Sequence, residues 1–190
     1  MGQAPAGGQR DDRADGELGD RVGAQGRQRH EPHPAAEAGR TVSQPRHEHA
    51  QVDAAFDKLK GRLASVAIDA GRKSPKAVVA LVGYPKLLPA DGASCNRSEV
   101  PFASGDYAFL HGTLVRLNDL IKEEAAKGGA HYIDTYKPSV GYDMCAPKDK
   151  RMIQPLIADG GIAPAAAHPN TPGILRLGAA VTQALAKLDR

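Results

Sequence analysis

A histidine stands directly before the last amphipathic segment of the chain, in the run His168-Pro169-Asn170-Thr171-Pro172-Gly173. An imidazole can accept a proton from a hydroxyl group and return it to a leaving group, so His168 is a candidate general base. The alternative interpretation is that His168 caps or packs against the start of the helix that follows. His111 and His131 fall within a predicted helix and a predicted strand beside apolar residues, and we interpret both as structural.

Three amphipathic helices are predicted from apolar residues that recur at helical spacing. The first begins near Val52 and is stopped by Ser74-Pro75, and the second begins near Asp106 and ends at Gly128-Gly129. The third opens at Thr171-Pro172, with proline in its first turn. Its apolar face is expected to be buried and consists of Ile174, Leu177, Val181, Leu185 and Leu188.

Two short strands are predicted between these helices, at residues 77–82 and 131–136. The first is a continuous apolar and β-branched run, which is typical of a strand buried on both faces of a parallel sheet. The order helix, strand, helix, strand, helix predicts a doubly wound α/β sheet with right-handed crossovers. Two strands alone leave apolar edges open, so we expect that the elements completing the sheet are missing from this chain or come from another.

Residues 1–50 differ in composition from the rest of the chain. Leu18, Val22 and Val42 are their only branched aliphatic residues, and their seven basic residues are all arginines, whereas eleven lysines and seven arginines follow. Such a segment buries too little apolar area to offset its ordering entropy, so it is predicted to be disordered. Two origins stay open, an out-of-frame or wrongly started reading and a natural flexible arm. Residues 51–190 are predicted to form the folded part.

Composition argues against several classes of function. The net charge of +3 is scattered without an aromatic and basic stripe, which argues against nucleic-acid binding. No apolar run reaches the roughly eighteen residues of a transmembrane helix, and no signal peptide is visible. No metal or cofactor is expected, because the N-terminal histidines have neither a nearby cysteine nor a scaffold; they are His30, His33, His47 and His49.

Several segments together resemble the C-terminal portion of the secreted bacterial SGNH (GDSL-type) hydrolases, a superfamily of lipases and esterases. The resemblance extends from about Val52 to Leu188. It implies a flavodoxin-like three-layer α/β/α fold, present here incompletely because the first strands and the serine block are not found. The matching segments are the strand leading into Val82-Gly83-Tyr84-Pro85, the loop from Cys95 to Phe102, the helix with Leu117-Asn118, the segment Tyr142-Asp143-Met144-Cys145, and the histidine block with Gly173.

The resemblance also implies a catalytic role for His168. In these hydrolases a serine attacks the ester carbonyl, and the histidine of the last block takes its proton. Many members place an aspartate three residues before that histidine, where this chain has Ala165. The group that orients the ring is therefore expected to be a main-chain carbonyl at Ala165, as in some secreted members, with Asp159 as a less favoured substitute.

No nucleophile or oxyanion residue is identified in the chain. There is no Gly-Asp-Ser motif and no Gly-x-Asn-Asp motif. Ser104-Gly105-Asp106 holds the nucleophile motif in the wrong order and is interpreted as a helix cap, and Leu117-Asn118-Asp119 lies inside a predicted helix. The remaining serines lack the strand-to-helix setting that exposes a nucleophile.

Cys95 and Cys145 are the only cysteines of the chain. The resemblance implies a disulfide between them, clamping loops that border the substrate groove, and hence a protein that is secreted or in the cell envelope. Two free buried thiols are the alternative. A crosslink over about fifty residues stabilises a fold by roughly 4 kcal/mol on the chain-entropy estimate.

We therefore predict a serine esterase or lipase that hydrolyses carboxylic (acyl) esters, to which this chain supplies the base histidine. The expected ligand is a small-molecule acyl ester, and a sheet-completing partner is expected as well. Two alternatives stay open, a catalytically inactive truncated remnant and a non-enzymatic interaction module.

Overall fold

The computed structural model describes residues 45–188. The first predicted helix is in fact two, α1 at Pro45–Leu59 and α2 at Arg62–Lys73. Gly61 separates them with a φ of 77°, a conformation that side chains disfavour. The buried Glu124 carboxylate accepts the Gly61 N–H at 2.5 Å. The prediction of one continuous helix is therefore wrong, because the break depends on a contact 63 residues away in the chain.

Helix α1 also starts before the predicted boundary of the folded part. It begins at Pro45, whereas the change of composition places the boundary at Gln51. The predictions of disorder and of an out-of-frame origin concern residues 1–50, of which residues 1–44 lie outside the described residues and residues 45–50 belong to α1. Of the N-terminal histidines, His49 stacks on Phe109 with ring centroids 4.6 Å apart, and His30 and His33 lie outside the described part.

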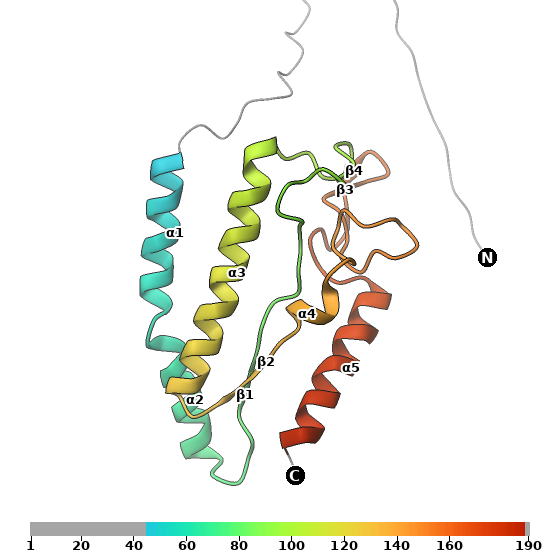
Figure 1. The fold of residues 1–190 in the computed structure, drawn as a ribbon. Helices are drawn as coiled ribbons and strands as arrows, with labels where there is room; N and C mark the ends of the chain where they lie inside the picture. The colour runs from blue at the N-terminus through green and yellow to red at the C-terminus, as the bar shows by residue number, and fades with distance from the viewer. Residues whose placement is uncertain (1–44, 189–190) are drawn as a thin grey trace, which may run out of the picture. The chain divides into compact units, whose positions relative to one another are not determined.

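A strand-helix-strand unit forms the centre of the α/β fold (Figure 1). Strand β1 at Ala80–Val82 pairs in parallel with β2 at His131–Ile133, and α3 at Ser104–Lys127 connects them. The parallel pair and its helical crossover confirm the prediction of an α/β arrangement. The Asp106 carboxylate accepts the Ala103 N–H at 3.1 Å, which places Ser104-Gly105-Asp106 at the helix start, as predicted.

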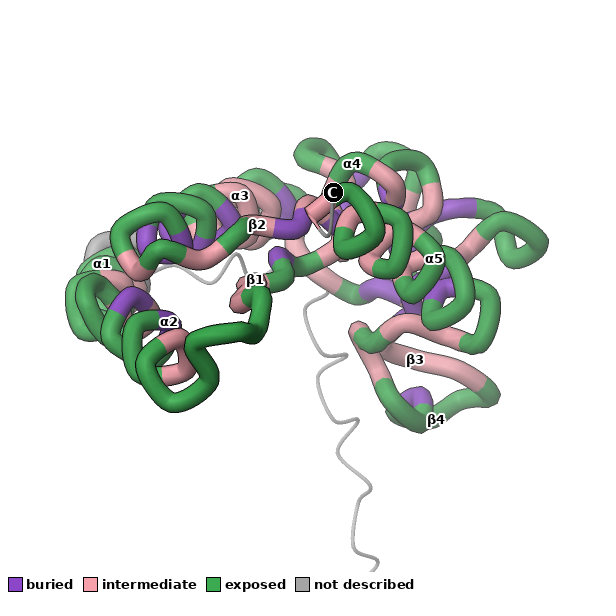
Figure 2. Tube along the Cα trace, turned by 90° about the horizontal axis from the view of Figure 1, so that it is seen from below, coloured by how far each residue is buried: buried purple, intermediate pink, exposed green. Residues whose placement is uncertain are grey.

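The first strand is not buried as predicted. Val78 and Val82 are 46% and 45% exposed, although their apolar, β-branched run predicts a strand covered on both faces. Helices α1, α2 and α3 lie to one side of the strand pair, whereas α4 (Tyr136–Ser139) and α5 lie to the other (Figure 2), and no residue of β1 is fully buried. The reason is that, among residues 45–188, the sheet has only two strands.

Helix α5, at Thr171–Leu188, begins where the sequence predicts. Its apolar face is not buried, however. Ile174 is 62% and Leu185 38% exposed, and Gly173 is the only residue of the helix that is buried. The prediction of a buried face is wrong, because within the described residues α5 packs chiefly on the short helix α4.

A cluster of buried apolar side chains lies chiefly in the loops between β1 and α5. A β-hairpin of two-residue strands, β3 at Ile157–Ala158 and β4 at Gly161–Ile162, rises from these loops and was not predicted. No helix among residues 45–188 is long and apolar enough to cross a bilayer. The core of the loops consists of Leu88, Val100, Met144, Cys145 and Ile153, together with Tyr107 from α3.

Candidate active site

His168 lies at the surface, in the segment that leads into α5. Its ring Nδ1 is 2.9 Å from the main-chain carbonyl oxygen of Ala166. A carbonyl oxygen only accepts hydrogen bonds, so Nδ1 carries a proton, and in the neutral ring Nε2 then has its lone pair free for an external donor. The prediction placed the orienting carbonyl at Ala165, whereas the Ala165 carbonyl accepts the main-chain N–H of His168 at 3.0 Å.

The residues on either side of Ala166 adopt a left-handed backbone. Ala165 has a φ of 55° and Ala167 a φ of 60°. For residues with a side chain this conformation costs roughly 1–2 kcal/mol each, so the surrounding structure must hold it in place. The Ala166 N–H bonds the Ala163 carbonyl at 3.0 Å, and the Ala167 N–H bonds the Gln154 carbonyl at 3.1 Å. This tight loop points the Ala166 carbonyl at the imidazole.

The segment at residues 151–154 lies beside the histidine block and holds it in place through hydrogen bonds. The Gln154 N–H donates to the His168 carbonyl at 2.8 Å, and the Asn170 N–H donates to the Met152 carbonyl at 2.9 Å. The Asn170 side chain accepts the Gly173 N–H at 3.0 Å and donates to the Arg151 carbonyl at 2.8 Å. A Cβ on Gly173 would lie 2.2 Å from the Met152 carbonyl oxygen, so this position requires glycine.

An apolar groove of about 230 Å³ opens next to the histidine block. Ala167, the residue before His168, forms part of its wall. The other apolar walls come from the loop after β1, from α3 and from the two later loops, namely Leu87, Leu88, Phe102, Leu110, Leu114, Leu117, Met144 and Leu156. A groove of this lining holds a hydrocarbon chain rather than a polar ligand.

A disulfide joins Cys95 to Cys145, with Cα atoms 4.5 Å apart. The prediction of this bridge is confirmed, and the alternative of two free thiols is wrong. Both cysteines pack in the loop core with Met144 and Phe102, two residues that line the apolar groove. The crosslink therefore ties together two loops that form the wall of the groove.

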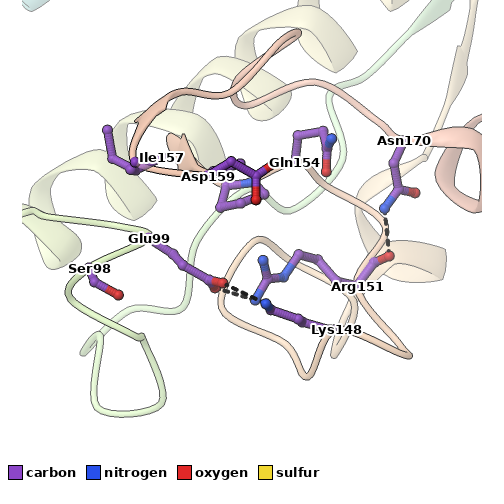
Figure 3. A pocket seen from close by; sticks show the side chains of 11 residues that line it. Ser98, Glu99, Lys148, Arg151, Gln154, Ile157, Asp159 and Asn170 are labelled. Atoms are coloured by element: carbon purple, nitrogen blue, oxygen red, sulfur yellow. Dashed lines mark hydrogen bonds and ion pairs between the residues drawn. The ribbon is translucent and has the colours of Figure 1, made fainter.

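A second, polar pocket of about 490 Å³ lies beside the same segments (Figure 3). Arg151 and Glu99 form an ion pair at 2.6 Å in its floor, with side chains only 10% and 16% exposed. The Lys148 amine lies 3.6 Å from the same carboxylate. The Arg151 hydrogen bond, together with the charges of Arg151 and Lys148, holds the pKa of Glu99 below its ordinary value of 4.5.

Asp159 does not contact the His168 ring. It lies exposed in the turn between β3 and β4, with a φ of 50°, and lines the polar pocket.

Asn118, which the sequence places inside a helix, is buried. Its side chain accepts a hydrogen bond from the Tyr84 main-chain N–H at 2.7 Å and donates one to the Tyr84 carbonyl at 2.9 Å. His111 hydrogen-bonds the Tyr136 hydroxyl at 2.8 Å, and His131 is exposed.

Among residues 45–188, none of the hydrogen bonds links a serine hydroxyl to His168. Ser139 is buried and bonds the Lys86 N–H and the Tyr136 carbonyl at 2.7 Å each. Ser65 bonds the Gly61 carbonyl, Ser98 bonds Asn96, and Ser104 accepts from Arg97. Nor does this part of the chain hold a group of three or more His, Cys, Asp or Glu side chains suited to a metal ion.

The sequence reasoning missed both cavities. One sequence feature could have indicated the polar pocket, namely that an acidic or a basic residue follows each cysteine at short spacing. Glu99 comes four residues after Cys95, and Arg151 comes six residues after Cys145. The groove had only a partial indication, since Leu110, Leu114 and Leu117 recur at helical spacing in α3, whereas Leu87, Leu88 and Leu156 belong to loops without a periodic pattern.

Comparisons with known proteins find relatives that are named as a lipase and an esterase. The chain is 34% identical over 105 residues to lipase 2 of Streptomyces coelicolor, covering 55% of this chain and 35% of that protein. It is 32% identical over 136 residues to an esterase of Streptomyces scabiei, covering 64% of this chain and 39% of that protein. The chain thus spans less than two fifths of the curated relatives it matches. No protein-family model matches it.

A solved structure has a similar fold. The phospholipase A1 of Streptomyces albidoflavus NA297 aligns with a TM-score of 0.58 over 70% of this chain and 56% of that chain. The two sequences are 24% identical, so this likeness supports the α/β fold alone. Together with the two sequence relatives, it makes the chain similar, over part of its length, to bacterial lipolytic hydrolases.

Proposed function

We propose that this chain carries the base histidine and the acyl-binding groove of a serine ester hydrolase of the SGNH type, with a three-layer α/β/α fold. The observation that carries the proposal is the His168 ring, which lies at the surface with Nδ1 bonded to the Ala166 carbonyl. The lipase and esterase relatives support the ester as the bond that is cleaved.

The geometry assigns a task to each nitrogen of the His168 ring. Nε2 takes the proton from a serine hydroxyl as its oxygen attacks the ester carbonyl, and returns it to the leaving alcohol. The ring is positively charged between these two steps. The Ala166 carbonyl, with its partial negative charge on Nδ1–H, stabilises that charge and keeps the ring from rotating, as an aspartate does in a triad.

The acyl chain of the substrate lies in the apolar groove. Ala167 lines the groove and is bonded directly to His168 in the chain, so an ester at the mouth of the groove is next to the imidazole. Burying the hydrocarbon there contributes about 25 cal/mol for each Å² of apolar surface removed from water.

The nucleophilic serine comes from a sheet-completing partner segment. Two exposed valines support this, Val82 in β1 and Val78 just before it, because added strands would cover them. The disulfide supports a protein that acts outside the cytoplasm, where such bonds persist.

Fragment complementation tests the proposal. The purified, oxidised chain is mixed with the part of the S. albidoflavus phospholipase A1 that has no counterpart here, and p-nitrophenyl butyrate hydrolysis is followed. We expect turnover that falls by a factor of about 10² to 10⁴ in His168→Ala. His131→Ala, which removes another exposed histidine, is the matched control and keeps the rate. Absence of turnover in the mixture, or turnover that does not depend on His168, rejects the proposal.

A non-enzymatic interaction module is the second candidate. The exposed apolar face of α5, with Ile174 and Leu175 62% and 69% exposed, favours it, because such a face is typical of a binding surface. In the same experiment this function predicts that the two fragments elute together without any hydrolysis.

A further inference from the structure

The apolar groove and the polar pocket have no lining residue in common, yet the same two segments contribute to both. In the segment that leads into and begins the β-hairpin, Leu156 lines the groove, whereas Gln154 and Ile157 line the polar pocket. In the segment before α5, Ala167 lines the groove and Asn170 lines the polar pocket. His168 stands between those two residues in the chain. The candidate base is therefore flanked by an apolar cavity and a polar one.

The floor of the polar pocket carries an excess of positive charge. One carboxylate, Glu99, faces two cations, the Arg151 guanidinium at 2.6 Å and the Lys148 amine at 3.6 Å. Arg151 is nearly buried and is held from behind by a bond from its Nε to the Ala146 carbonyl at 3.1 Å. Among residues 45–188 no partner is found for its Nη1, and the guanidinium faces the cavity in Figure 3.

The opposite wall carries a negative charge that the floor does not neutralise. Asp159 projects from the turn between β3 and β4 on the wall facing the Glu99–Arg151 pair (Figure 3). It makes no ion pair with either cation within the described residues, so a gap separates it from the floor. A ligand that spans this gap needs an anionic group for the floor and a cationic group for Asp159.

We propose that the polar pocket binds the zwitterionic headgroup of a glycerophospholipid, with its phosphate on Arg151 and Lys148 and its amine facing Asp159. A guanidinium offers paired N–H donors that match phosphate oxygens, and a nearby lysine adds charge. The acyl chain occupies the apolar groove on the other side of His168. This inference rests on the proposed function, and it narrows the substrate from acyl esters in general to phospholipids.

A matched pair of ligands tests the pocket without requiring turnover. Dibutyrylphosphatidylcholine and dibutyrylglycerol have the same acyl groups and differ only in the headgroup. Binding of each to the oxidised His168→Ala chain is measured by NMR titration or calorimetry, in which hydrolysis cannot intervene. We expect the phospholipid to bind about tenfold more tightly, and Lys148→Glu to remove this preference. Lys148 is 84% exposed, so its replacement leaves the fold intact.

Two control variants distinguish binding in the polar pocket from a general effect of surface charge on lipid binding. Lys150→Glu makes the same charge change on an exposed neighbour that does not line the pocket, and it should leave the preference within about twofold. Asp159→Asn should weaken binding of phosphatidylcholine but not of phosphatidic acid with the same chains, which has no amine. Equal affinity for the two dibutyryl lipids, or equal effects of Lys148→Glu and Lys150→Glu, overturns the inference.

Inorganic phosphate distinguishes a headgroup site from a free-anion site. We expect it to bind far more weakly than the phospholipid, and displacement of the phospholipid by equimolar phosphate overturns the inference. The proposed function fails separately, through the absence of His168-dependent ester hydrolysis in the complementation assay. A chain that hydrolyses esters but shows no headgroup preference retains the proposed function and loses the phospholipid pocket.

Discussion

The loops between β1 and α5 and the regular elements around them differ in how completely they are packed. Ile153, in an irregular segment, is fully buried, whereas Ile174, on a regular amphipathic helix, is 62% exposed. The loops are closed by a disulfide, a nearly buried ion pair and a shared apolar core. Burial in the described part of the chain thus does not follow regular secondary structure, because the loops have a core of their own besides the buried residues of α2, α3 and β2. The loops carry their own core, whereas the strand pair and α5 present surfaces that other elements can cover.

Among the tests of the difference in packing between the loops and the regular elements, removing the disulfide has the largest expected effect. Cys95 and Cys145 close a loop of 50 residues, and opening it raises the entropy of the unfolded chain by an amount equivalent to about 4 kcal/mol. We expect the double variant Cys95→Ser with Cys145→Ser to lose about that much free energy of unfolding in urea titrations. The oxidised wild-type chain treated with reductant should match the double variant. Equal stability of oxidised and reduced chains would show that the loops do not depend on the bridge.

A pair of identical substitutions compares the two regions directly. Ile153→Ala removes a fully buried side chain from the loop core and should cost about 3 kcal/mol, since a cavity remains. Ile174→Ala removes the same atoms from the exposed face of α5 and should change stability by no more than about 0.5 kcal/mol. Urea unfolding of both variants measures the difference. Similar losses at the two positions would mean that α5 is covered in solution.

The sequence predicts which segments form helices and strands better than it predicts how far those helices and strands are buried. The parallel strand pair, its crossover helix and the start of α5 follow from local patterns, a β-branched run, helical spacing and a proline in the first turn. Burial of the strands and of α5 does not follow, because it depends on neighbours that these patterns do not specify. The break at Gly61 is also non-local, since Glu124 comes from a helix 63 residues further on.

The sequence likewise predicts some features of the candidate site and not others. His168 and the Cys95–Cys145 bridge are predicted through a family resemblance, because both lie in short recognisable segments. The left-handed backbone of Ala165 and Ala167 has no sequence indication, because alanine rarely adopts it and tertiary bonds impose it here. The two cavities are assembled from several loops, with α3 adding one wall of the groove, and no single segment encodes them.

The smallest expected effect compares two ion pairs of the same length, one in each region. Glu99 and Arg151 lie 2.6 Å apart and are nearly buried in the loops, whereas Asp53 and Arg116 lie 2.6 Å apart on α1 and α3 with both side chains 55% exposed. Glu99→Gln should cost about 1–3 kcal/mol, because Arg151 loses a charge-assisted partner. Asp53→Asn should cost less than about 1 kcal/mol, since water screens an exposed pair.

The dependence of stability on pH distinguishes these two pairs further. The Arg151 hydrogen bond lowers the pKa of Glu99 in the folded chain below its ordinary value of 4.5. The folded state therefore binds the proton less readily than the unfolded state, and the Glu99 contribution is complete above pH 4.5 and is lost as the pH falls through the folded pKa. Urea unfolding between neutral pH and pH 3 should show a steeper acid loss in the wild-type chain than in Glu99→Gln, and Asp53→Asn should follow the wild type. If Glu99→Gln retains the full acid loss, the ion pair contributes nothing to the stability of the loops, and their packing must rest on the disulfide and the apolar core.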